Sequence, residues 1–204
     1  MVHSPFIDIS ASEKSELLSL ARHSISYFIS QRKTLAIDLN NYSERLRQQA
    51  ASFVTLHSKA KLRGCIGSTT AYQPLAVDVV HHAQAAAFED PRFPPVTADE
   101  HEEITISVSV LTHPEPLNVD DIQQLVDQLE PGVDGLIIKD GFHQATFLPS
   151  VWQQLPEPRN FLQHLIRKAG LPVNYAGDNL QAWIYQTIEF SEGEELSKEH
   201  SEEK

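Results

Sequence analysis

The chain has 204 residues, of which 41% are hydrophobic and 22% are charged, so it holds enough apolar material for the core of a globular domain. Its 28 acidic and 16 basic residues give a formal net charge of -12, which argues against binding to nucleic-acid phosphates or to anionic membrane surfaces. The single cysteine excludes an internal disulfide and a cysteine-rich zinc site, and it is typical of a reducing compartment.

The N-terminal residues show neither the basic segment nor the apolar segment of a secretory signal. No stretch approaches the roughly 18 apolar residues of a membrane span. Lys and Arg form no run that would supply a nucleic-acid-binding patch. We therefore expect a cytoplasmic protein that binds neither membranes nor nucleic acids.

The first predicted element is a helix that follows Ser10 and runs to about Ser30. Ser10 and Glu13 have the spacing of a capping box, and apolar residues recur behind them at helical spacing. Arg22 and His23 fall outside the apolar side, so we expect both of them to face solvent.

A β-hairpin and a second long helix are predicted next. Ser43 is expected to cap a short helical turn. Residues 53–57 and 62–68 are β-rich and flank a polar turn, which predicts a hairpin. Pro74 suits the first turn of a helix that runs to about Phe88.

The register of this hairpin decides which side chains share a face. We take His57 to lie opposite Leu62 across the turn. This pairing places Arg63 and Cys65 on the face that also carries Leu56. His57 then lies on the other face, where it is poorly placed to act as a base for Cys65. A slip of one residue would reverse the assignment.

The middle of the chain combines a stiff loop, a strand and a helix. Three prolines in residues 90–95 fix the backbone of the loop. The alternation in residues 103–111 predicts a half-buried strand. Asn118 or Asp120 is expected to cap a helix that ends near Leu129.

The last third of the chain begins with a second hairpin. Asp140-Gly141 is a strong signal for its turn, between strands at 135–139 and 142–147. Two short helices and a final strand complete the pattern, and they are expected at residues 149–155, 158–169 and 181–190.

The order of these elements suggests a duplication. Residues 51–111 and residues 134–190 both run hairpin, helix, strand. We expect the α+β class, with two similar halves that form two lobes and with mixed or antiparallel sheets flanked by helices. Rossmann and barrel folds are excluded because strands and helices do not alternate singly. The expected boundaries are 1–115 and 116–190 for the lobes of a single domain, and 191–204 for a disordered acidic tail.

The stretch from Leu62 to Ser68 is the most distinctive in the chain. It holds the only cysteine, with an arginine two residues before it and glycines close on both sides. A nearby guanidinium favours the thiolate form of a cysteine, so Cys65 and Arg63 are candidate catalytic residues. Gly64 and Gly67 would let another group approach closely and are candidate binding residues. A lone cysteine on a strand is also commonly a small buried hydrophobe, and both interpretations stay open.

Further polar residues have a functional and a structural interpretation. Arg63 and Arg92 together would form a fork for a carboxylate or phosphate, whereas a pair of Asp90 with an arginine would simply pin the proline loop. His82 follows Asp78 by one helical turn, as in pairs that orient a catalytic imidazole, but a histidine on an apolar helix face is more often a core residue. The ten histidines lack ligand spacing, so we expect no metal and no cofactor, and the sequence leaves open only a metal site that the fold builds from residues distant in sequence.

The sequence Leu62-Arg63-Gly64-Cys65-Ile66-Gly67 resembles the signature of the AMMECR domain family, whose bacterial members are protein A of the AmmeMemoRadiSam system. The resemblance extends over about residues 50–190 and implies two similar β-β-β-α-α-β halves. The family pattern has Asn where this chain has His82, which weakens a role for His82 as an essential base. The other matching segments follow in the family's order, at Pro74-Leu75, Asp78-Val79, Ala85-Ala86-Ala87-Phe88, Asp90-Pro91-Arg92-Phe93-Pro94-Pro95, Ser107-Val108-Ser109-Val110-Leu111, Pro131-Gly132-Val133-Asp134-Gly135-Leu136, Thr146-Phe147-Leu148-Pro149, Val151-Trp152 and Lys168-Ala169-Gly170-Leu171.

The resemblance also implies partners, namely a Memo-like protein similar to extradiol dioxygenases and a radical S-adenosylmethionine protein. An iron–sulfur cluster would belong to the latter, because one cysteine cannot hold it. The first hypothesis is an enzyme or enzyme subunit that modifies a small molecule. Cys65 would be the nucleophile or covalent carrier, Arg63 would stabilise its thiolate or bind an anionic substrate group, and Asp90 would position Arg92.

The second hypothesis is a non-catalytic adaptor that docks a partner protein in a cleft between its halves, with Cys65 as inert packing. The sequence leaves the choice between enzyme and adaptor open, together with the substrate, the reaction and the oligomeric state.

Overall fold

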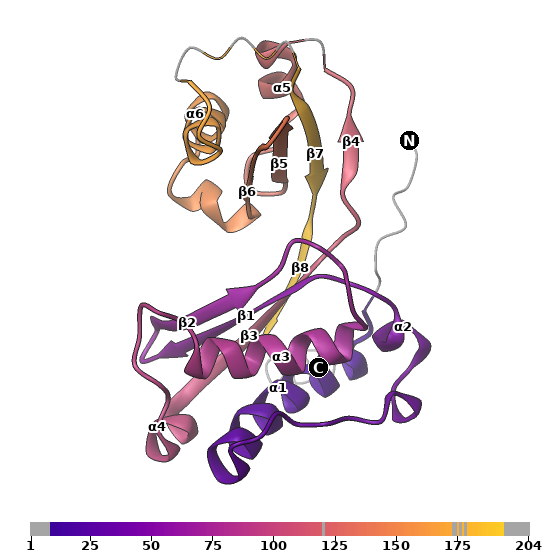
Figure 1. Ribbon diagram of the computed structural model, residues 1–204, viewed down its shortest axis with the longest axis vertical. Helices are drawn as coiled ribbons and strands as arrows, with labels where there is room; N and C mark the ends of the chain where they lie inside the picture. The colour runs from indigo at the N-terminus through magenta and orange to yellow at the C-terminus, as the bar shows by residue number, and fades with distance from the viewer. Residues whose placement is uncertain (1–8, 120, 173–174, 176, 178, 194–204) are drawn as a thin grey trace, which may run out of the picture. The chain divides into compact units, whose positions relative to one another are not determined.

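The computed structural model describes residues 9–119, 121–172, 175, 177 and 179–193 (Figure 1). These residues form two compact units. The first runs to Leu111 and resumes at Ile188, and the second is Thr112–Thr187. Each unit contains a four-stranded antiparallel sheet and helices that pack on it, which confirms the α+β class.

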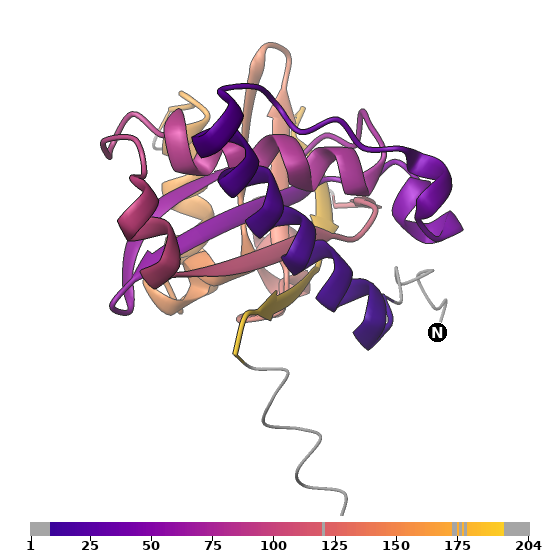
Figure 2. The same ribbon diagram turned by 90° about the horizontal axis from the view of Figure 1, so that it is seen from below.

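The first unit has the strand order β2-β1-β3-β8. Helix α3 packs against β1 and β2, and α1 packs against α3 and β3 (Figure 2). The core between them is built from aliphatic side chains of all these elements. In chain order the elements are α1 (Ala11–Gln31), η1 (Leu39–Asn41), α2 (Glu44–Arg47), β1 (Ser52–Ser58), β2 (Lys61–Gly67), α3 (Leu75–Phe88), α4 (Ala98–Glu103), β3 (Ile104–Leu111) and β8 (Thr187–Ser191).

Helix α1 begins at the predicted capping box. Ser10 Oγ accepts a hydrogen bond from the Glu13 backbone N–H, and the Glu13 carboxylate accepts one from the Ser10 N–H. The helix ends at Gln31, one residue beyond the expected end, and its C-cap Arg32 has the left-handed conformation. Short α2 is capped by Ser43, as predicted.

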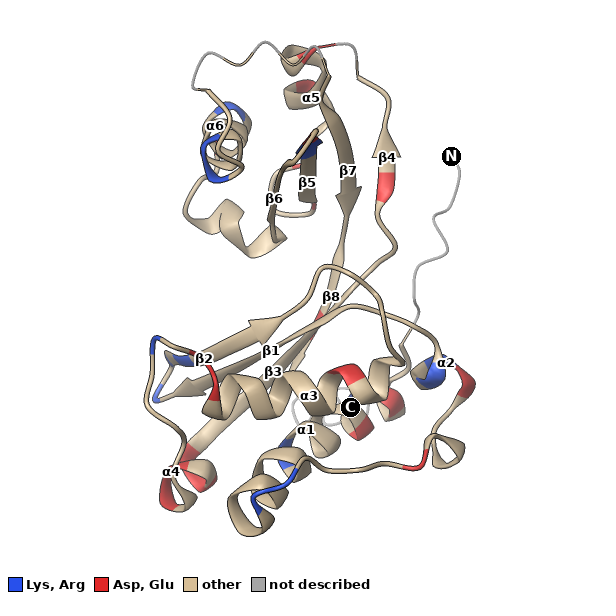
Figure 3. Ribbon diagram, viewed as in Figure 1, with Lys and Arg blue, Asp and Glu red and all other residues tan. Residues whose placement is uncertain are grey.

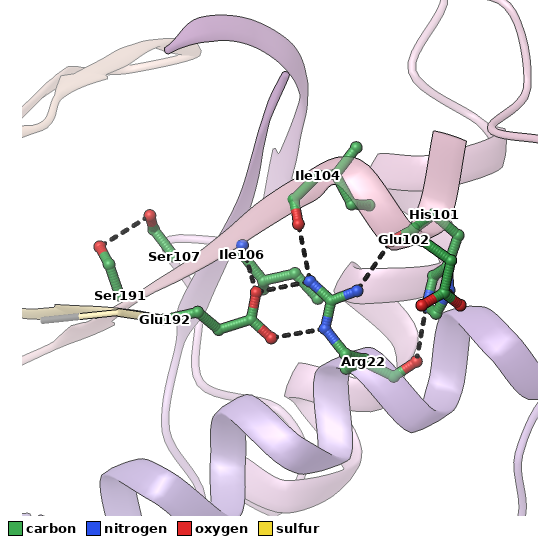
Figure 4. A network of polar contacts seen from close by, with 8 residues as sticks. All are labelled: Arg22, His101, Glu102, Ile104, Ile106, Ser107, Ser191 and Glu192. Atoms are coloured by element: carbon green, nitrogen blue, oxygen red, sulfur yellow. Dashed lines mark hydrogen bonds and ion pairs between the residues drawn. The ribbon is translucent and has the colours of Figure 1, made fainter. Parts of the chain in front are cut away.

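Arg22 is not the solvent-facing residue that the sequence predicted, whereas His23 is exposed. The Arg22 guanidinium donates to the backbone oxygens of His101 at 2.8 Å and Ile104 at 2.7 Å (Figure 4). It also forms an ion pair with Glu192 at 2.6 Å. Arg22 therefore fastens α1 to the end of α4 and the start of β3.

Glu192 closes the same network from the C-terminal side. Its carboxylate accepts from the Ile106 N–H at 2.9 Å, and its own N–H donates to the Ile106 oxygen at 3.0 Å. Ser191 lies in β8, where its hydroxyl contacts that of Ser107 at 2.9 Å (Figure 4). The predicted disordered tail at 191–204 is therefore wrong for Ser191 and Glu192, while residues 194–204 lie outside the described part of the chain.

The β1–β2 hairpin has the expected pairing at its turn but a different register beyond it. His57 lies opposite Leu62, and then one extra residue on β2, Arg63, forms a bulge. Thr55 is therefore opposite Cys65, and the expectation that Cys65 shares a face with Leu56 is wrong. Leu56 is fully buried toward α3, so Cys65 lies on the opposite face of the sheet.

The turn of this hairpin is unusual in its sequence. Lys59 has φ 50° and Ala60 has φ 62°, the left-handed region that a two-residue turn of this type requires. Asn-Gly normally occupies such turns, and a residue with a side chain is disfavoured there by roughly 1–2 kcal/mol.

The second unit has the strand order β4-β7-β5-β6, with α5 and α6 contributing to its core. Trp152 stacks on Phe161 at 3.7 Å in that core. Helix α5 is capped by Asp121 and not by Asn118, whereas Asp120 lies outside the described residues. The elements are β4 (Glu115–Leu117), α5 (Ile122–Gln128), β5 (Gly135–Asp140), β6 (His143–Phe147), η2 (Pro149–Gln153), α6 (Pro158–Lys168) and β7 (Gln181–Tyr185).

The two sheets repeat one topology. Each is built from a hairpin, two helical segments and a third strand, so that β2-β1-β3 corresponds to β6-β5-β7. The fourth strand comes from the other half of the chain, because β4 follows β3 and β8 follows β7.

The predicted strand at 181–190 is divided at Gln186, which exchanges two hydrogen bonds of 2.8 Å with Thr112. The predicted boundary at 115/116 assumed two continuous lobes, whereas the chain returns to its first unit at Ile188.

Candidate functional site

Cys65 lies at the edge of the first sheet, because β2 pairs with β1 on one side only. Its side chain is partly exposed, and Thr55 Oγ1 on the neighbouring strand donates to Cys65 Sγ at 3.3 Å. The Cys65 N–H donates to Asp90 Oδ2 at 2.9 Å, and Arg92 Nη2 donates to the Cys65 oxygen at 3.3 Å. Both outward backbone groups of Cys65 are therefore held by the loop that follows α3.

Asp90 and Arg92 form a compact ion pair behind this contact. Arg92 donates to Asp90 through Nε at 2.9 Å, through Nη2 at 2.6 Å and through its backbone N–H at 3.1 Å. The side chain of Asp90 is 2% exposed and that of Arg92 is 52% exposed. The hydrogen bonds from Arg92 and from the Cys65 N–H hold the pKa of Asp90 well below its usual range. The pair pins the proline loop to the edge of β2.

The sequence suggested that Arg63 contacts the Cys65 thiolate, but in the structure Arg63 pairs with Glu100. Its guanidinium forms a double hydrogen bond with the carboxylate of Glu100 in α4, and its Nη2 donates to the Pro94 oxygen at 2.8 Å. These bonds from Arg63 lower the pKa of Glu100. Among the hydrogen bonds of the described residues, the guanidinium that reaches Cys65 is that of Arg92, and it contacts the backbone.

Phe93 links the two arginines. The guanidinium carbon of Arg63 lies 5.7 Å from the centre of the Phe93 ring, and that of Arg92 lies 5.4 Å away. Both distances suit cation–π contacts. The predicted cluster of Arg63, Asp90 and Arg92 is thus assembled through Phe93 and through the backbone of the loop, with Glu100 as an additional member.

Both glycines of the signature stand where a side chain has no room. A Cβ at Gly64 would lie 2.2 Å from the Ala86 oxygen in α3, so this glycine lets the strand approach the helix. A Cβ at Gly67 would lie 2.3 Å from the ring of Phe53, the residue opposite it. The structure accounts for Gly64 and Gly67 by packing.

Asp78 and His82 belong to a buried network behind β1. Ser52 donates to Asp78 Oδ2 through its N–H at 2.9 Å and its hydroxyl at 2.7 Å, and Gln73 donates to Asp78 Oδ1 at 2.9 Å. His82 Nδ1 lies 3.1 Å from Asp78 Oδ2. All three of Ser52, Asp78 and His82 are buried, so the network braces α3 against β1.

Two features are missing among the residues that the structure describes. None of their His, Cys, Asp and Glu side chains gather in threes in a way that could hold a metal ion. None of their helices is long and apolar enough to cross a membrane.

Two residues of the site, Thr55 and Glu100, were not predicted from the sequence. Thr55 is revealed only by the bulge, which brings it opposite Cys65. Glu100 follows Thr97 by three residues, and Thr97 Oγ1 accepts from the Glu100 N–H at 3.3 Å to cap α4. The capping pattern Thr97–Glu100 was visible in the sequence and is the signal that could have found this helix.

The arrangement offers a fixed thiol with a hydroxyl donor and a cation on neighbouring residues. Thr55 bonds the sulfur directly, while Asp90 and Arg92 fix the backbone that carries it. The site can thus present a positioned nucleophile to a small molecule.

Known proteins match most of the chain. The sequence model of the AMMECR1 family matches residues 18–190. A protein of Methanothermobacter thermautotrophicus is 37% identical over 168 residues, which are 82% of this chain and 87% of that protein. A protein of Methanocaldococcus jannaschii is 34% identical over 178 residues, which are 85% and 87% of the two chains.

A solved structure shares the fold. The crystal structure of an uncharacterized protein from Pyrococcus horikoshii superposes with a TM-score of 0.80 at 29% sequence identity, and the match covers 91% of this chain and 94% of that one. The match to the family extends over both units, including the thiol at the edge of β2 and the loop that clamps it. The chain therefore belongs to the AMMECR1 family.

Proposed function

We propose that the protein is the protein A component of an AmmeMemoRadiSam-type system and that it is an enzyme subunit with Cys65 as its nucleophile. The observation that supports this best is the hydrogen bond from Thr55 to Cys65 Sγ on a strand whose edge is clamped by Asp90 and Arg92. A catalytic thiol needs partial exposure and a fixed position, and Cys65 has both.

The proposed substrate is a small molecule with an electrophilic carbon and a leaving group. Cys65 Sγ forms a bond to that carbon while the bond to the leaving group breaks, and the leaving group takes the bonding electron pair. The thiol proton passes to solvent. A second nucleophile then displaces the sulfur and regenerates Cys65, so the residue acts as a carrier.

The other residues of the site have supporting roles in this proposal. Thr55 stabilises the thiolate by donating to it, and Arg92 supplies positive charge close to the strand. Asp90 positions Arg92 and the backbone of Cys65. Arg63 keeps α4 and the proline loop in place, which is a positioning role and not the thiolate-stabilising role that its sequence spacing suggested.

We propose a Memo-like protein and a radical S-adenosylmethionine protein as partners, acting together with this chain in the cytoplasm. Membership in the AMMECR1 family supports the partnership. A single cysteine is typical of a reducing compartment and cannot hold an iron–sulfur cluster, so that cofactor belongs to the partner.

Substitution of Cys65 tests the proposal. The full chain and both partner proteins are incubated with a small-molecule extract of the source cells, and intact mass reports any adduct on the chain. We expect an adduct on the unchanged protein, none on Cys65→Ser, and thermal midpoints that agree within about 2 °C because one sulfur is replaced by oxygen. Equal turnover of the small molecule by Cys65→Ser would rule out the nucleophilic role.

A non-catalytic adaptor is the second candidate function. The observation that favours it is that Arg63, Gly64, Gly67 and Asp90 all have structural partners, so packing alone accounts for much of the signature. An adaptor predicts that Cys65→Ser binds both partners as tightly as the unchanged chain and supports the same turnover.

A further inference from the structure

The far end of the β1–β2 hairpin has an exposed apolar and basic surface. Lys59 and Lys61 are exposed in and beside the turn, and Leu62 next to them is 43% exposed. Within the described part of the chain, Leu62 is one of three large hydrophobic residues with such exposure, the others being Tyr72 and Phe142.

Exposed prolines extend this surface along the edge of β2. Pro91, Pro94 and Pro95 are exposed, and the loop that carries them is held in one conformation by Asp90, by Arg92 and by the bond from Arg63 to the Pro94 oxygen. A loop fixed in this way loses little conformational entropy when a partner binds it. We call the surface formed by Lys59, Lys61, Leu62 and residues 91–95 the hairpin corner.

The turn keeps a lysine where the backbone disfavours it. Lys59 and Ala60 both have positive φ in a turn that Asn-Gly would form with less strain. Strain of this kind persists where the surroundings or the use of the side chain require it. The Lys59 side chain is exposed, so packing does not explain its presence.

The charge of the corner is positive in an acidic protein. Asp90 and Glu100 are neutralised by Arg92 and Arg63, whereas Lys59 and Lys61 form no ion pair with any residue that the structure describes. Figure 3 shows Lys and Arg gathered at the end of the hairpin and in the loop after α3, next to the acidic helix α4. Helix α4 carries the exposed carboxylates of Asp99, Glu102 and Glu103.

We propose that the hairpin corner docks an acidic segment of a partner protein that also carries apolar side chains. Lys59 and Lys61 would attract the carboxylates, and Leu62 with the prolines would cover the apolar side chains. Addition of a partner strand to β2 is disfavoured, because Asp90 and Arg92 already occupy the outward backbone groups of Cys65. The proposal does not depend on any reaction of Cys65.

A random peptide library tests this directly. Twelve-residue peptides displayed on phage are selected on the full chain, and the selected peptides are synthesised with a fluorescent label. We expect the selected sequences to be enriched in Asp and Glu together with Leu, Ile or Phe. Their affinity, measured by fluorescence anisotropy, is expected to fall at least tenfold in Lys59→Glu/Lys61→Glu and in Leu62→Ser.

Matched control variants test whether the loss of peptide affinity is specific to the hairpin corner. Arg32→Glu/Lys33→Glu reverses two exposed neighbouring cations after α1, and it should leave the affinity within twofold. Cys65→Ser should do the same, which keeps this test distinct from that of the nucleophile. Selected peptides without acidic enrichment, or with equal affinity for the corner variants and the unchanged chain, would overturn the proposal.

Discussion

The edge strands β2 and β6 occupy the same position in the two sheets, yet they are closed in different ways. At β2, buried Asp90 and half-exposed Arg92 hold both outward backbone groups of Cys65. At β6, Lys168 from α6 donates to the Thr146 oxygen at 2.9 Å from an exposed position. Both clamps place a cation near a phenylalanine ring, Phe93 in one unit and Phe147 in the other.

The two edges differ in how firmly their strands are held. An exposed cation on a carbonyl protects a sheet edge from unwanted pairing at little energetic cost. A carboxylate that is nearly buried is costly unless it is fully paired, and here its partners fix the strand that carries the thiol. The unit with the candidate site therefore has the stronger clamp.

The two sheets also differ in the side chains on the face that is turned away from the helices. On the first sheet, Thr55 lies between Cys65 on β2 and Ser107 on β3, and the Ser107 hydroxyl contacts that of Ser191 on β8. On the second sheet, Tyr185 is buried over Gly135 and its hydroxyl bonds to Thr146 at 3.0 Å. One face is suited to polar chemistry, while the other is closed by an aromatic ring.

The largest expected effect is that of Gly64→Ala, because the new Cβ would meet the backbone of Ala86 at 2.2 Å. We expect a loss of about 3 kcal/mol or more of unfolding free energy, measured by urea denaturation with circular dichroism. Gly135→Ala meets the ring of Tyr185 at 2.4 Å, which is a side chain and not a backbone, so its loss should be smaller. A loss for Gly64→Ala below that for Gly135→Ala would contradict this account of the signature.

Asp90→Asn should lower the free energy of unfolding by about 2 kcal/mol, because it removes a buried charge that pairs with a half-exposed Arg92. Hydrogen exchange should accelerate in β2 and leave β6 unchanged. The folded carboxyl has a lowered pKa, so its contribution is fully present above the usual value of 3.8 and is lost as the pH falls further. The difference in unfolding free energy between the unchanged protein and Asp90→Asn should therefore narrow below about pH 4. A difference that stays constant would refute the ionic clamp.

Tyr185→Phe should cost about 1 kcal/mol at neutral pH, since the hydroxyl loses its bonds to Thr146 and to the Phe147 oxygen. Burial raises the pKa of Tyr185 to about 12. The protonated Tyr185 hydroxyl thus contributes stability that is complete below pH 10 and disappears as the pH rises to about 12. Absorbance titration of the phenolate and unfolding at pH 8 to 12 would check both effects, and Tyr185→Phe should show a smaller alkaline loss, since burial also raises the pKa of Tyr42 and of Tyr72.

The smallest effect is expected for Lys168→Met, about 0.5 kcal/mol, because the clamp on β6 is exposed to solvent. Hydrogen exchange should rise in β6 and not in β2. A loss as large as that of Asp90→Asn would remove the distinction between the two edges.

Local signals in the sequence were sufficient for much of the fold. The capping box at Ser10 and Glu13 and the hairpin near Asp140-Gly141 each act within a few residues, and both are confirmed, although the two turn residues are Gly141 and Phe142 because Asp140 pairs with His143 at the end of β5. The bulge at Arg63 has no such signal, because the pairing of two strands decides it. That single inserted residue moved Cys65 to the opposite face from the one predicted.

Two further errors share this origin in long-range contacts, whereas the failure to predict helix α4 has a local cause. Arg22 looked solvent-facing because its partner Glu192 is 170 residues away. The strand at 181–190 looked continuous because its division at Gln186 depends on a bond to Thr112. Helix α4 is six residues long and mostly acidic, so it has no apolar periodicity to reveal it.

The most direct test of the central claim is the rate at which iodoacetamide labels Cys65 in the native chain at pH 7, followed by intact mass and compared with the rate in urea. The single thiol makes the assignment unambiguous. A positioned nucleophile with a hydroxyl donor predicts native labelling faster than in the unfolded chain, with the advantage reduced in Thr55→Val. Labelling that appears only after unfolding would show that Cys65 is inert packing and would contradict the account.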